Sequence, residues 1–350
     1  MRDNKVTVAV ASYNNAKYLS RCINSIIEQS YRKLDILVVD DGSSDETEEI
    51  LKSFDDNRIR CIFKENGGLS SSRQLALEKA TGEFIMFVDA DDYLPAEAIE
   101  TLVERIITTN ADICVCSTEI RNSSGEILEY ETSIFSVNEG NDIVISKEAI
   151  AHSYGPISNK YCMSDSWDKL YKTTFLYESG VGFSMPKGYN GTDSIFNHKL
   201  LLHCPKIISI SKVCYIHIMY EKSAVHRKHR DIQKSMNFLI SELIAEAQKI
   251  GNNSFIKEQI PYLYYGYLRN SIIDVMGDYS DRREINAAIK KVMENHFRFI
   301  SENNITEGTT NSMSMSVKLF VWCVKIRRIG LIKFGIKLRN VALKKMRKRR

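Results

Sequence analysis

The sequence predicts an α/β fold in which a mainly parallel sheet is flanked by helices and followed by a helical C-terminal extension. Through about residue 117, short apolar segments rich in β-branched side chains alternate with amphipathic segments of helical period. Strands that are joined by helical crossovers form parallel sheets. After residue 228, apolar side chains recur at helical spacing. We therefore expect four parts: a main domain over 1–225, a helical extension over 226–300, a polar linker over 301–316 and a basic amphipathic tail over 317–350.

Each element of the main domain has its own local signal. Apolar runs predict strands at residues 6–11, 34–39, 60–63, 84–88 and 113–117, and the β-branched run at 6–11 predicts a strand that is buried on both faces. Apolar spacing and capping residues predict helices over residues 19–27, from residue 43, and over 69–80 and 95–107. From residue 120 to 159 the pattern weakens, and we expect a long loop or a small insertion there.

Charge is distributed unevenly along the chain. The net charge is +4, yet residues 316–350 contain thirteen Lys or Arg and no Asp or Glu. The remaining 315 residues therefore carry a net charge of −9. An acidic body argues against nucleic acid as a partner of the main domain, and a basic tail indicates a separate anionic partner.

The cysteines and the apolar segments indicate a cytoplasmic protein. The eight cysteines are scattered, mostly within apolar segments such as 112–116, which is typical of buried free thiols. A strand is predicted from residue 6, so we expect no signal peptide. The longest apolar run, residues 319–324, is too short to span a bilayer.

Polar side chains follow three of the predicted strands. Ser12, Tyr13 and Asn14 follow the first strand, Asp40 and Asp41 the second, and an acidic run from residue 89 the fourth. In open α/β sheets, ligands bind beyond the carboxyl ends of the strands. A tyrosine can stack on a base, and a carboxylate can accept from a base N–H or a ribose hydroxyl. These strand ends suit a nucleotide, although neither GxGxxG nor a Walker A sequence is present.

The acidic run Asp89-Ala90-Asp91 has the chemistry of a metal–diphosphate site. Two carboxylates on alternate residues can share a divalent cation, and the small Ala90 lets a ligand approach. Mg²⁺ and Mn²⁺ prefer such oxygen ligands and keep positions open for phosphate oxygens. The alternative is an acidic turn that caps the helix beginning near Pro95.

Several segments together resemble family 2 glycosyltransferases. They are ASYN at 11–14, VVDDGSSD at 38–45, NGGLSSSR at 66–73 and TGEFIMFVDADD at 81–92. The resemblance is dense over the first third of the chain and sparser to about residue 225. It implies a GT-A fold, a nucleoside-diphosphate sugar donor, usually linked to UDP, a Mn²⁺ or Mg²⁺ ion and inversion at the anomeric carbon.

The resemblance also implies roles for individual residues. Ser12, Tyr13, Asp40 and Asp41 would hold the nucleoside. Arg73, Asp89 and Ala90 would lie at the donor, and Asp91, in the family's DXD motif, would contact the metal, with Asp89 as a further candidate ligand. Gln74 departs from the family, which commonly has Asn after this arginine.

An inverting transfer needs a base that takes the proton from the acceptor hydroxyl. The candidate is Asp193, in a segment similar to the family's Glu-Asp motif, with Thr192 in place of the usual Glu. The alternative is that Asp193 is the N-cap of the helix that follows.

Three further residues have weaker signals. Trp167 and Lys169 are similar to the Trp-x-Lys-Leu-Tyr segment of many such enzymes, and Trp167 could stack on an acceptor sugar. The alternative is a core tryptophan and a surface lysine. His217 falls where some relatives have a metal or phosphate ligand, although a lone histidine is more often structural.

The tail predicts an amphipathic helix at an anionic membrane surface. Its apolar face contains Leu331, Phe334, Leu338 and Val341, and lysines 333, 337, 344 and 348 lie elsewhere on the helix. The alternatives are a helix packed on the body and a nucleic-acid contact, for which no aromatic platform is present.

The combined interpretation is a metal-dependent, hexosyltransferase-type glycosyltransferase. It would move a sugar from a nucleoside-diphosphate donor to a glycan or lipid-linked acceptor in surface polysaccharide synthesis, at the inner face of the cell membrane. The alternatives are a nucleotidyltransferase, which would need a Gly-rich basic loop after the first strand, and a membrane-recruited nucleotide-sugar-binding scaffold without turnover. Sugar, linkage and oligomeric state have no signal in the sequence.

Overall fold

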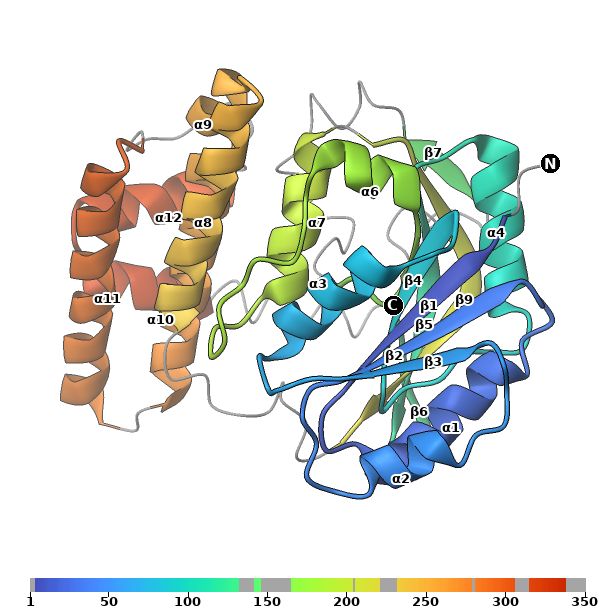
Figure 1. The fold of residues 1–350 in the computed structure, drawn as a ribbon. Coiled ribbons are helices and arrows are strands. Elements are labelled where there is room, and N and C mark those ends of the chain that lie inside the picture. The colour runs from blue at the N-terminus through green and yellow to red at the C-terminus, as the bar shows by residue number, and fades with distance from the viewer. Residues whose placement is uncertain are drawn as a thin grey trace. The chain divides into compact units, whose positions relative to one another are not determined.

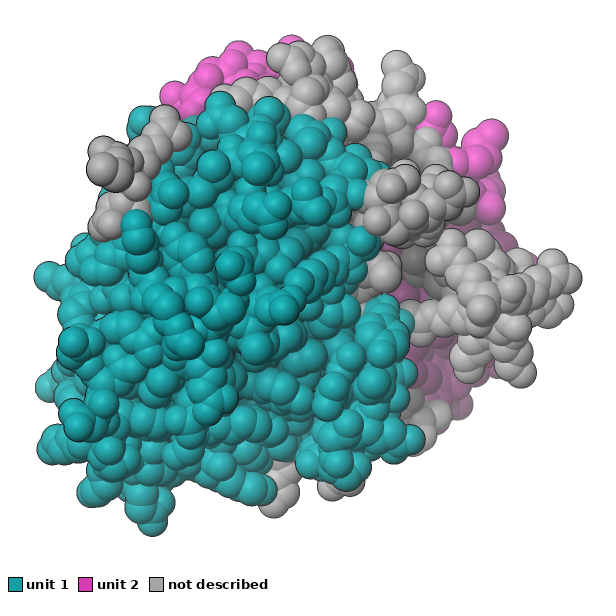
Figure 2. Space-filling model, turned by 90° about the vertical axis from the view of Figure 1, so that its right-hand side faces the viewer, with its two compact units in different colours: residues 1–229 teal, residues 230–350 magenta. Residues whose placement is uncertain are grey.

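The chain forms two compact units, Met1–His229 and Arg230–Arg350 (Figures 1 and 2). The computed structural model describes residues 4–131, 142–145, 165–203, 205–220, 232–278, 281–305 and 315–337. The expected end of the main domain at residue 225 lies close to the division between the units.

The first unit is built on a mixed sheet that is mainly parallel. Its described strands are β1 (Val6–Ser12), β2 (Leu34–Asp40), β3 (Ile59–Phe63), β4 (Phe84–Asp89), β5 (Ile113–Asn122), β6 (Ile127–Glu131), β7 (Ile143–Ile145), β8 (Lys169–Lys172) and β9 (Ile207–Met219). Their order is β3-β2-β1-β4-β8-β5-β9-β7, and β6 pairs with β5. Strands β1, β2, β3 and β4 are parallel to their neighbours within this group, as predicted.

Helices cover both faces of this sheet (Figure 1). They are α1 (Ala16–Ile27), α2 (Thr47–Lys52), α3 (Leu69–Lys79), α4 (Ala98–Thr109), α6 (Thr173–Ser179) and α7 (Thr192–Leu202). Helices α1 and α4 pack their apolar sides on the even-numbered side chains of β1, β2 and β4, forming one continuous core. The other face is covered by α3 and by α7, whose Phe196 packs edge-on against Phe87 of β4.

Strand β8 lies between β4 and β5, which the sequence alone did not predict. It is antiparallel to both neighbours, and it pairs Leu170 with Met86 on one side and with Cys114 on the other. The region of weak pattern contains β6, β7 and residues outside the described part. Because β8 starts at Lys169, the residues before it come to lie beside the carboxyl end of β4.

The second unit is helical, as expected. Its described helices are α8 (Ile232–Lys249), α9 (Asn253–Glu258), α10 (Ile260–Asp278), α11 (Arg282–Glu302) and α12 (Met315–Lys325). The side chain of Asp281 accepts from the backbone N–H groups of Arg283 and Glu284 and so caps α11. Residues 329–337 of the tail are also helical, whereas Leu338 and Val341 lie outside the described residues.

The six described cysteines are free thiols, as predicted; Cys162 and Cys204 lie outside the described residues. Among the helices of the described ranges, none has the length and apolar character that crossing a bilayer requires.

Candidate active site

Three predicted strand ends meet at one edge of the sheet. β1 lies between β2 and β4, with Ser12 opposite Asp40 and Ala11 opposite Asp89. The polar residues that follow these strands are therefore neighbours in space. This is the edge at which parallel α/β sheets bind ligands.

Ser12 and Tyr13 lie next to each other at this edge but differ in exposure. The Ser12 hydroxyl is buried and has no hydrogen-bond partner among the described residues. The Tyr13 ring is 50% exposed. Next to it, Asn14 has a φ of 53°, and its side chain accepts from the Ser44 N–H, which joins the ends of β1 and β2. A buried orphan hydroxyl beside an exposed ring is chemistry that a bound ligand would complete.

Asp40 and Asp41 are buried and make hydrogen bonds within the protein. Asp40 accepts from the backbone and the hydroxyl of Ser43. Asp41 accepts from Lys64 Nζ at 2.5 Å and from the N–H groups of Gly67 and Gly68 at 3.0 and 2.7 Å. Burial would raise the pKa of Asp41, but these donors outweigh it and lower that pKa. Asp41 therefore holds the loop before α3 against β2.

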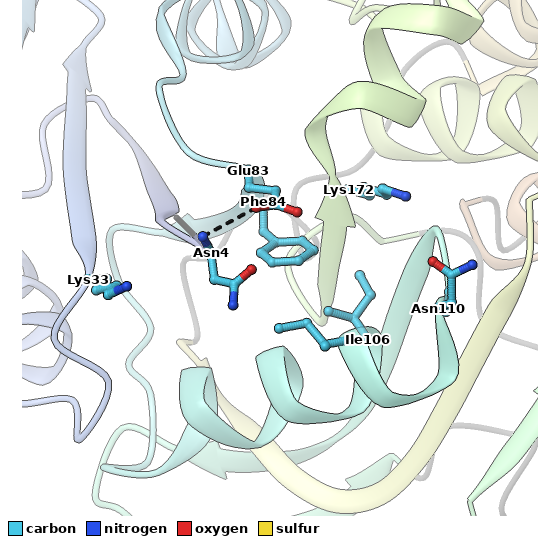
Figure 3. A pocket seen from close by; sticks show the side chains of 9 residues that line it. Asn4, Lys33, Glu83, Phe84, Ile106, Asn110 and Lys172 are labelled. Carbon is cyan, nitrogen blue, oxygen red and sulfur yellow. Dashed lines mark hydrogen bonds between the residues drawn. The ribbon is translucent and has the colours of Figure 1, made fainter. Parts of the chain in front are cut away.

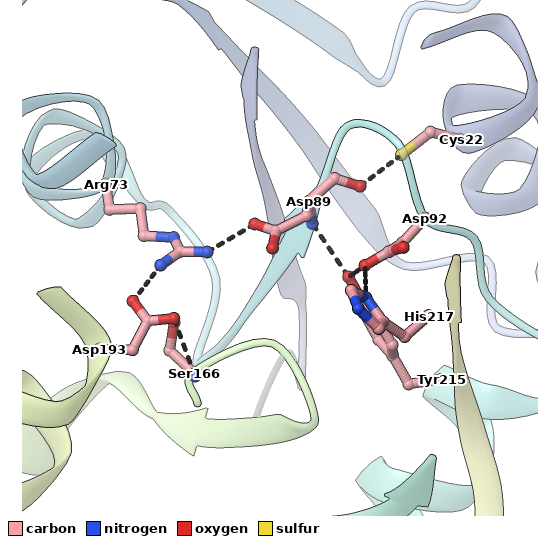
Figure 4. A network of polar contacts seen from close by, with 8 residues as sticks. All are labelled: Cys22, Arg73, Asp89, Asp92, Ser166, Asp193, Tyr215 and His217. Atoms are coloured by element: carbon pink, nitrogen blue, oxygen red, sulfur yellow. Dashed lines mark hydrogen bonds and ion pairs between the residues drawn. The ribbon is translucent and has the colours of Figure 1, made fainter. Parts of the chain in front are cut away.

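Arg73 of α3 joins two carboxylates from different parts of the chain (Figure 4). Its guanidinium binds Asp89 at the end of β4, with Nη2 2.5 Å from Oδ1, and it also binds Asp193 in the first turn of α7. The arginine is nearly fully buried and packs near the Phe183 ring. Burial raises the pKa of the Asp193 carboxyl, and Arg73 offsets only part of that rise.

Asp193 is not an N-cap. α7 begins at Thr192, its N-cap is Gly191 with a φ of 94°, and no side chain caps it. Asp193 lies one residue further on, and its second oxygen accepts from the backbone N–H of Ser166. The capping alternative is therefore wrong, and the carboxylate points toward Arg73 (Figure 4).

The acidic turn after β4 does not cap α4, since that helix begins at Ala98 after Glu97. Burial and the neighbouring charges of Asp92 and Asp89 raise the pKa of Asp91 to about 7. The Asp91 carbonyl oxygen accepts from Arg21 Nη2 at 2.6 Å. Asp91 is thus a carboxylate in a site with surplus negative charge.

Asp92 was not among the predicted site residues, yet it organises the turn. Fully buried, it accepts from Tyr215 Oη at 2.8 Å and from the Ile218 N–H at 2.8 Å, and its Oδ2 lies 3.1 Å from His217 Nδ1. Burial would lower the pKa of His217, but Asp92 outweighs it and raises that pKa to about 9. The only sequence signal for a role of Asp92 was its position as a third acid directly after Asp89 and Asp91. The sequence contained no signal for a role of Tyr215.

Trp167 and Lys169 lie beneath the site and are not exposed. The Trp167 ring stacks on His217 with a centroid distance of 5.5 Å and packs on Tyr215 at 4.6 Å. Lys169 is fully buried, and its ammonium binds the Asp165 carbonyl oxygen and Asp168. Of the alternative, the core tryptophan is confirmed and the surface lysine is wrong. Trp167 supports His217 from below.

Three side chains at this turn are of types that could hold a divalent cation. Asp89 and Asp91 offer hard oxygen ligands, and the Asp92 contact through Nδ1 leaves Nε2 of His217 for a ligand. Within the described residues, no group of three or more acidic, His or Cys side chains is arranged as a metal site. Mg²⁺ and Mn²⁺ commonly bind through one or two carboxylates together with substrate phosphates, so Asp89 and Asp91 are the side chains that could hold such an ion.

A cavity of 390 Å³ opens beside Asp193. It is lined by residues 67–70 at the start of α3, by Asp165, and by residues 185–194, which include the start of α7. The buried Ser70 hydroxyl in this lining has no hydrogen-bond partner among the described residues. The cavity thus combines a carboxylate with an unused hydroxyl.

A second cavity, of 310 Å³, lies at the opposite edge of the sheet (Figure 3). Its lining includes Asn4, Lys33 and Phe84, which lie where β1, β2 and β4 begin. None of the predicted site residues lines it. We therefore assign the functional site to the carboxyl ends of the strands.

Gln74, where the resemblance departs from the family, has a structural role here. Its side-chain oxygen accepts from the Phe183 N–H at 2.8 Å, and Gly182 packs against the amide so closely that a Cβ would lie 2.4 Å from that oxygen. Phe183 in turn packs near Arg73. Gln74 thus holds the segment that covers Arg73.

Comparison with known proteins identifies the family of the chain. The model of the family described as glycosyl transferase family 2 matches residues 7–156. The chain is 36% identical over 270 residues to glycosyltransferase EpsJ of Bacillus subtilis, covering 74% of this chain and 76% of EpsJ. It is 35% identical over 216 residues to glycosyltransferase GlyA of Streptococcus pneumoniae, covering 61% of this chain but only 30% of GlyA.

The fold is similar to that of Staphylococcus aureus TarS 1–349 solved with UDP-GlcNAc. The TM-score is 0.67 at 19% sequence identity, and the alignment covers 97% of this chain and 92% of that one. This confirms the expected GT-A fold. Because EpsJ is 36% identical across 76% of its length, and because the family model spans the strand ends that meet at Asp89, the chain belongs to glycosyltransferase family 2.

Proposed function

We propose that this chain is a metal-dependent, inverting glycosyltransferase. It transfers a sugar from a nucleoside-diphosphate donor, UDP-linked by preference, to a glycan or lipid-linked acceptor in surface polysaccharide synthesis. The main support for the proposal is the pair of ion pairs made by Arg73, which joins Asp89 at the carboxyl end of β4 to Asp193 on α7. A transferase needs a donor site and a base within reach of each other, and these ion pairs link the two.

The donor occupies the carboxyl ends of β1, β2 and β4. The exposed Tyr13 ring stacks on the base, and the orphan Ser12 hydroxyl supplies a hydrogen bond. Asp40 and Asp41 act mainly by holding the loops around the nucleoside. Ala90, buried and small, leaves room beside the diphosphate. The similar fold of TarS, solved with UDP-GlcNAc, supports this choice of donor.

Asp91, with Asp89 and His217 as further candidates, would hold Mn²⁺ or Mg²⁺. A bound divalent ion would neutralise charge on the departing diphosphate. The chain's own contribution is to keep carboxylates gathered at the strand end, while Asp92 and Trp167 orient His217.

Asp193 acts as the general base. It accepts the proton of the acceptor hydroxyl as that oxygen bonds to the anomeric carbon, and the bond from this carbon to the diphosphate oxygen breaks with its electron pair on the diphosphate. Attack from the face opposite the leaving group inverts the anomeric configuration. Arg73 offsets part of the rise that burial causes in the pKa of Asp193, and it positions the carboxylate.

The acceptor enters the cavity beside Asp193. This cavity has the volume of a small-ligand site, and Ser70 offers a buried hydroxyl to an acceptor hydroxyl. Trp167 and Lys169, the acceptor residues expected from the sequence, are buried behind the site and act as its support. We also propose that residues 317–350 bring the enzyme to an anionic membrane surface, where a lipid-linked acceptor would be held.

The test is the variant Asp193→Asn, assayed with a panel of nucleotide sugars and Mn²⁺. Transfer should fall by about 1,000-fold or more, while UDP binding measured by calorimetry is retained. Transfer at the wild-type rate would show that Asp193 is not the base.

Glu97→Gln is the matched control, since it also removes a carboxylate from an ion pair, with Lys212, at an exposed position. It should leave transfer unchanged. UDP binding without transfer in the wild-type protein, across the whole panel of donors and acceptors, would favour the scaffold alternative.

A further inference from the structure

Helix α12 carries an unusual row of exposed apolar side chains. Met315, Leu319, Trp322 and Ile326 are 82, 59, 52 and 39% exposed. Their spacing of four, three and four residues puts Met315, Leu319 and Trp322 on one face of α12, and Ile326, directly after the helix, continues the row. The opposite face is held in place, because Val321 and Val324 are buried. The helix is therefore packed on one side and apolar on its open side.

The following helical segment, residues 329–337, repeats this arrangement. Ile332 and Ile336 are buried, whereas Leu331 and Phe334 are exposed. Lys333 Nζ donates to Asn286 Oδ1 of α11 at 3.2 Å, which anchors the segment to its unit. Of the apolar face expected from the sequence, the two described residues, Leu331 and Phe334, are thus exposed. The predicted tail over 317–350 includes most of α12, although none of the four residues named for its apolar face lies on that helix.

The charges along this segment of the chain all have one sign. Residues 315–337 contain six Lys or Arg and no Asp or Glu, and residues 338–350 contain seven more. Lys318 and Lys325 lie beside the apolar row on α12. Apolar and aromatic side chains surrounded by basic ones match a bilayer interface with anionic headgroups.

We propose that the open faces of α12 and residues 329–337, here named the α12 surface, dock on an anionic lipid bilayer, with Trp322 inserted at the level of the headgroups. The proposal rests on the membrane association proposed above and gives it a surface. It does not depend on the transfer chemistry.

The protein contains its own probe for this contact. It has two tryptophans, of which Trp167 is buried in the first unit and Trp322 is exposed on the α12 surface. With vesicles of phosphatidylglycerol and phosphatidylcholine, the fluorescence of the full chain should shift to shorter wavelength. Vesicles of phosphatidylcholine alone should produce little shift, and high salt should weaken binding. Trp322→Phe should abolish the shift while the protein still sediments with the vesicles.

Leu319→Glu tests the surface itself. Because it replaces an inserted apolar side chain by an acid, it should weaken sedimentation with the anionic vesicles by about tenfold or more. The matched control is Leu128→Glu, which changes a leucine on β6 of the first unit that is 51% exposed, and it should have no effect. Equal vesicle binding by Leu319→Glu and the wild type would overturn the proposal.

Two further outcomes would also overturn it. One is equal binding to neutral and anionic vesicles. The other is a concentration-dependent dimer, seen by light scattering, that Leu319→Glu dissolves, because the surface would then serve a second copy. Transfer to a soluble acceptor, measured on the same variants, separates failure of this proposal from failure of the proposed reaction.

Discussion

Replacing Arg73 by Met should destabilise the first unit by about 3 kcal/mol. Removing one partner of a buried ion pair costs roughly 3–5 kcal/mol, because the remaining charge stays buried without compensation. The Arg73 side chain is 3% exposed, that of Asp193 15% and that of Asp89 29%. Since Asp89 keeps contact with solvent, we take the lower end of that range. For a unit of this size, about 3 kcal/mol lowers Tm by roughly 6–12 °C.

The assay is thermal unfolding of the full chain followed by Trp167 fluorescence in a Trp322→Phe background, so that the signal comes from the first unit alone. The pH dependence has a defined sign. Without Arg73, the raised pKa of Asp193 rises further, so the folded state gains stability as falling pH protonates this carboxyl. The difference between variant and wild type should therefore shrink from pH 8 to pH 5.

The double variant Arg73→Met/Asp193→Asn tests the reasoning directly. Asparagine removes the uncompensated charge, so the double variant should be more stable than Arg73→Met alone. If it is equally or less stable, the cost of Arg73→Met arises from lost packing against Phe183 and not from a buried carboxylate.

Three further predictions concern the metal site, a buried histidine and a close backbone contact. Asp91→Asn should lower transfer by about 100-fold or more and raise the Mn²⁺ concentration for half-maximal rate, and an unchanged metal titration would contradict the assignment. His296 of α11 is buried, stacks on Tyr264 and has no hydrogen-bond partner among the described residues, and burial lowers its pKa to about 3. The free energy of unfolding of the second unit, measured in urea, should therefore fall by up to about 2–3 kcal/mol between pH 6.5 and pH 4.5. His296→Phe should remove this pH dependence. Gly82→Ala should destabilise the first unit by about 1–3 kcal/mol, because the new Cβ would lie 2.5 Å from the Thr7 backbone nitrogen. The control Gly266→Ala changes a glycine in open space within α10 and should be neutral or slightly stabilising. Equal Tm values for the two variants would contradict the close contact at Gly82.

Local patterns were sufficient for much of the first unit. The five predicted strands are all present, because runs such as 34–39 are buried on both faces and so lack alternation. The predicted helices are present with shifted ends, and α4 begins at Ala98 where Pro95 had been the expected start. β8 was missed because a four-residue strand has too few positions for a period to be visible.

The strand-end residues Ser12, Asp40 and Asp89 could be grouped from the sequence because parallel strands align their carboxyl ends, whatever lies between them. The sequence could not show in the same way which side chains form ion pairs with one another. Arg73 and Asp193 are separated by 120 positions, and only the packing of α3 and α7 on the same face of the sheet brings them together. The sequence by itself determined the chemistry at the edge of the sheet, since composition and strand order are local properties. Only the tertiary structure decided that Asp41 holds a loop and that Asp92 orients His217. It also decided that Lys169 is buried and that the apolar row from Met315 to Ile326 is exposed. The physical reason is that burial and the choice of hydrogen-bond partner depend on contacts between segments that are distant in the sequence.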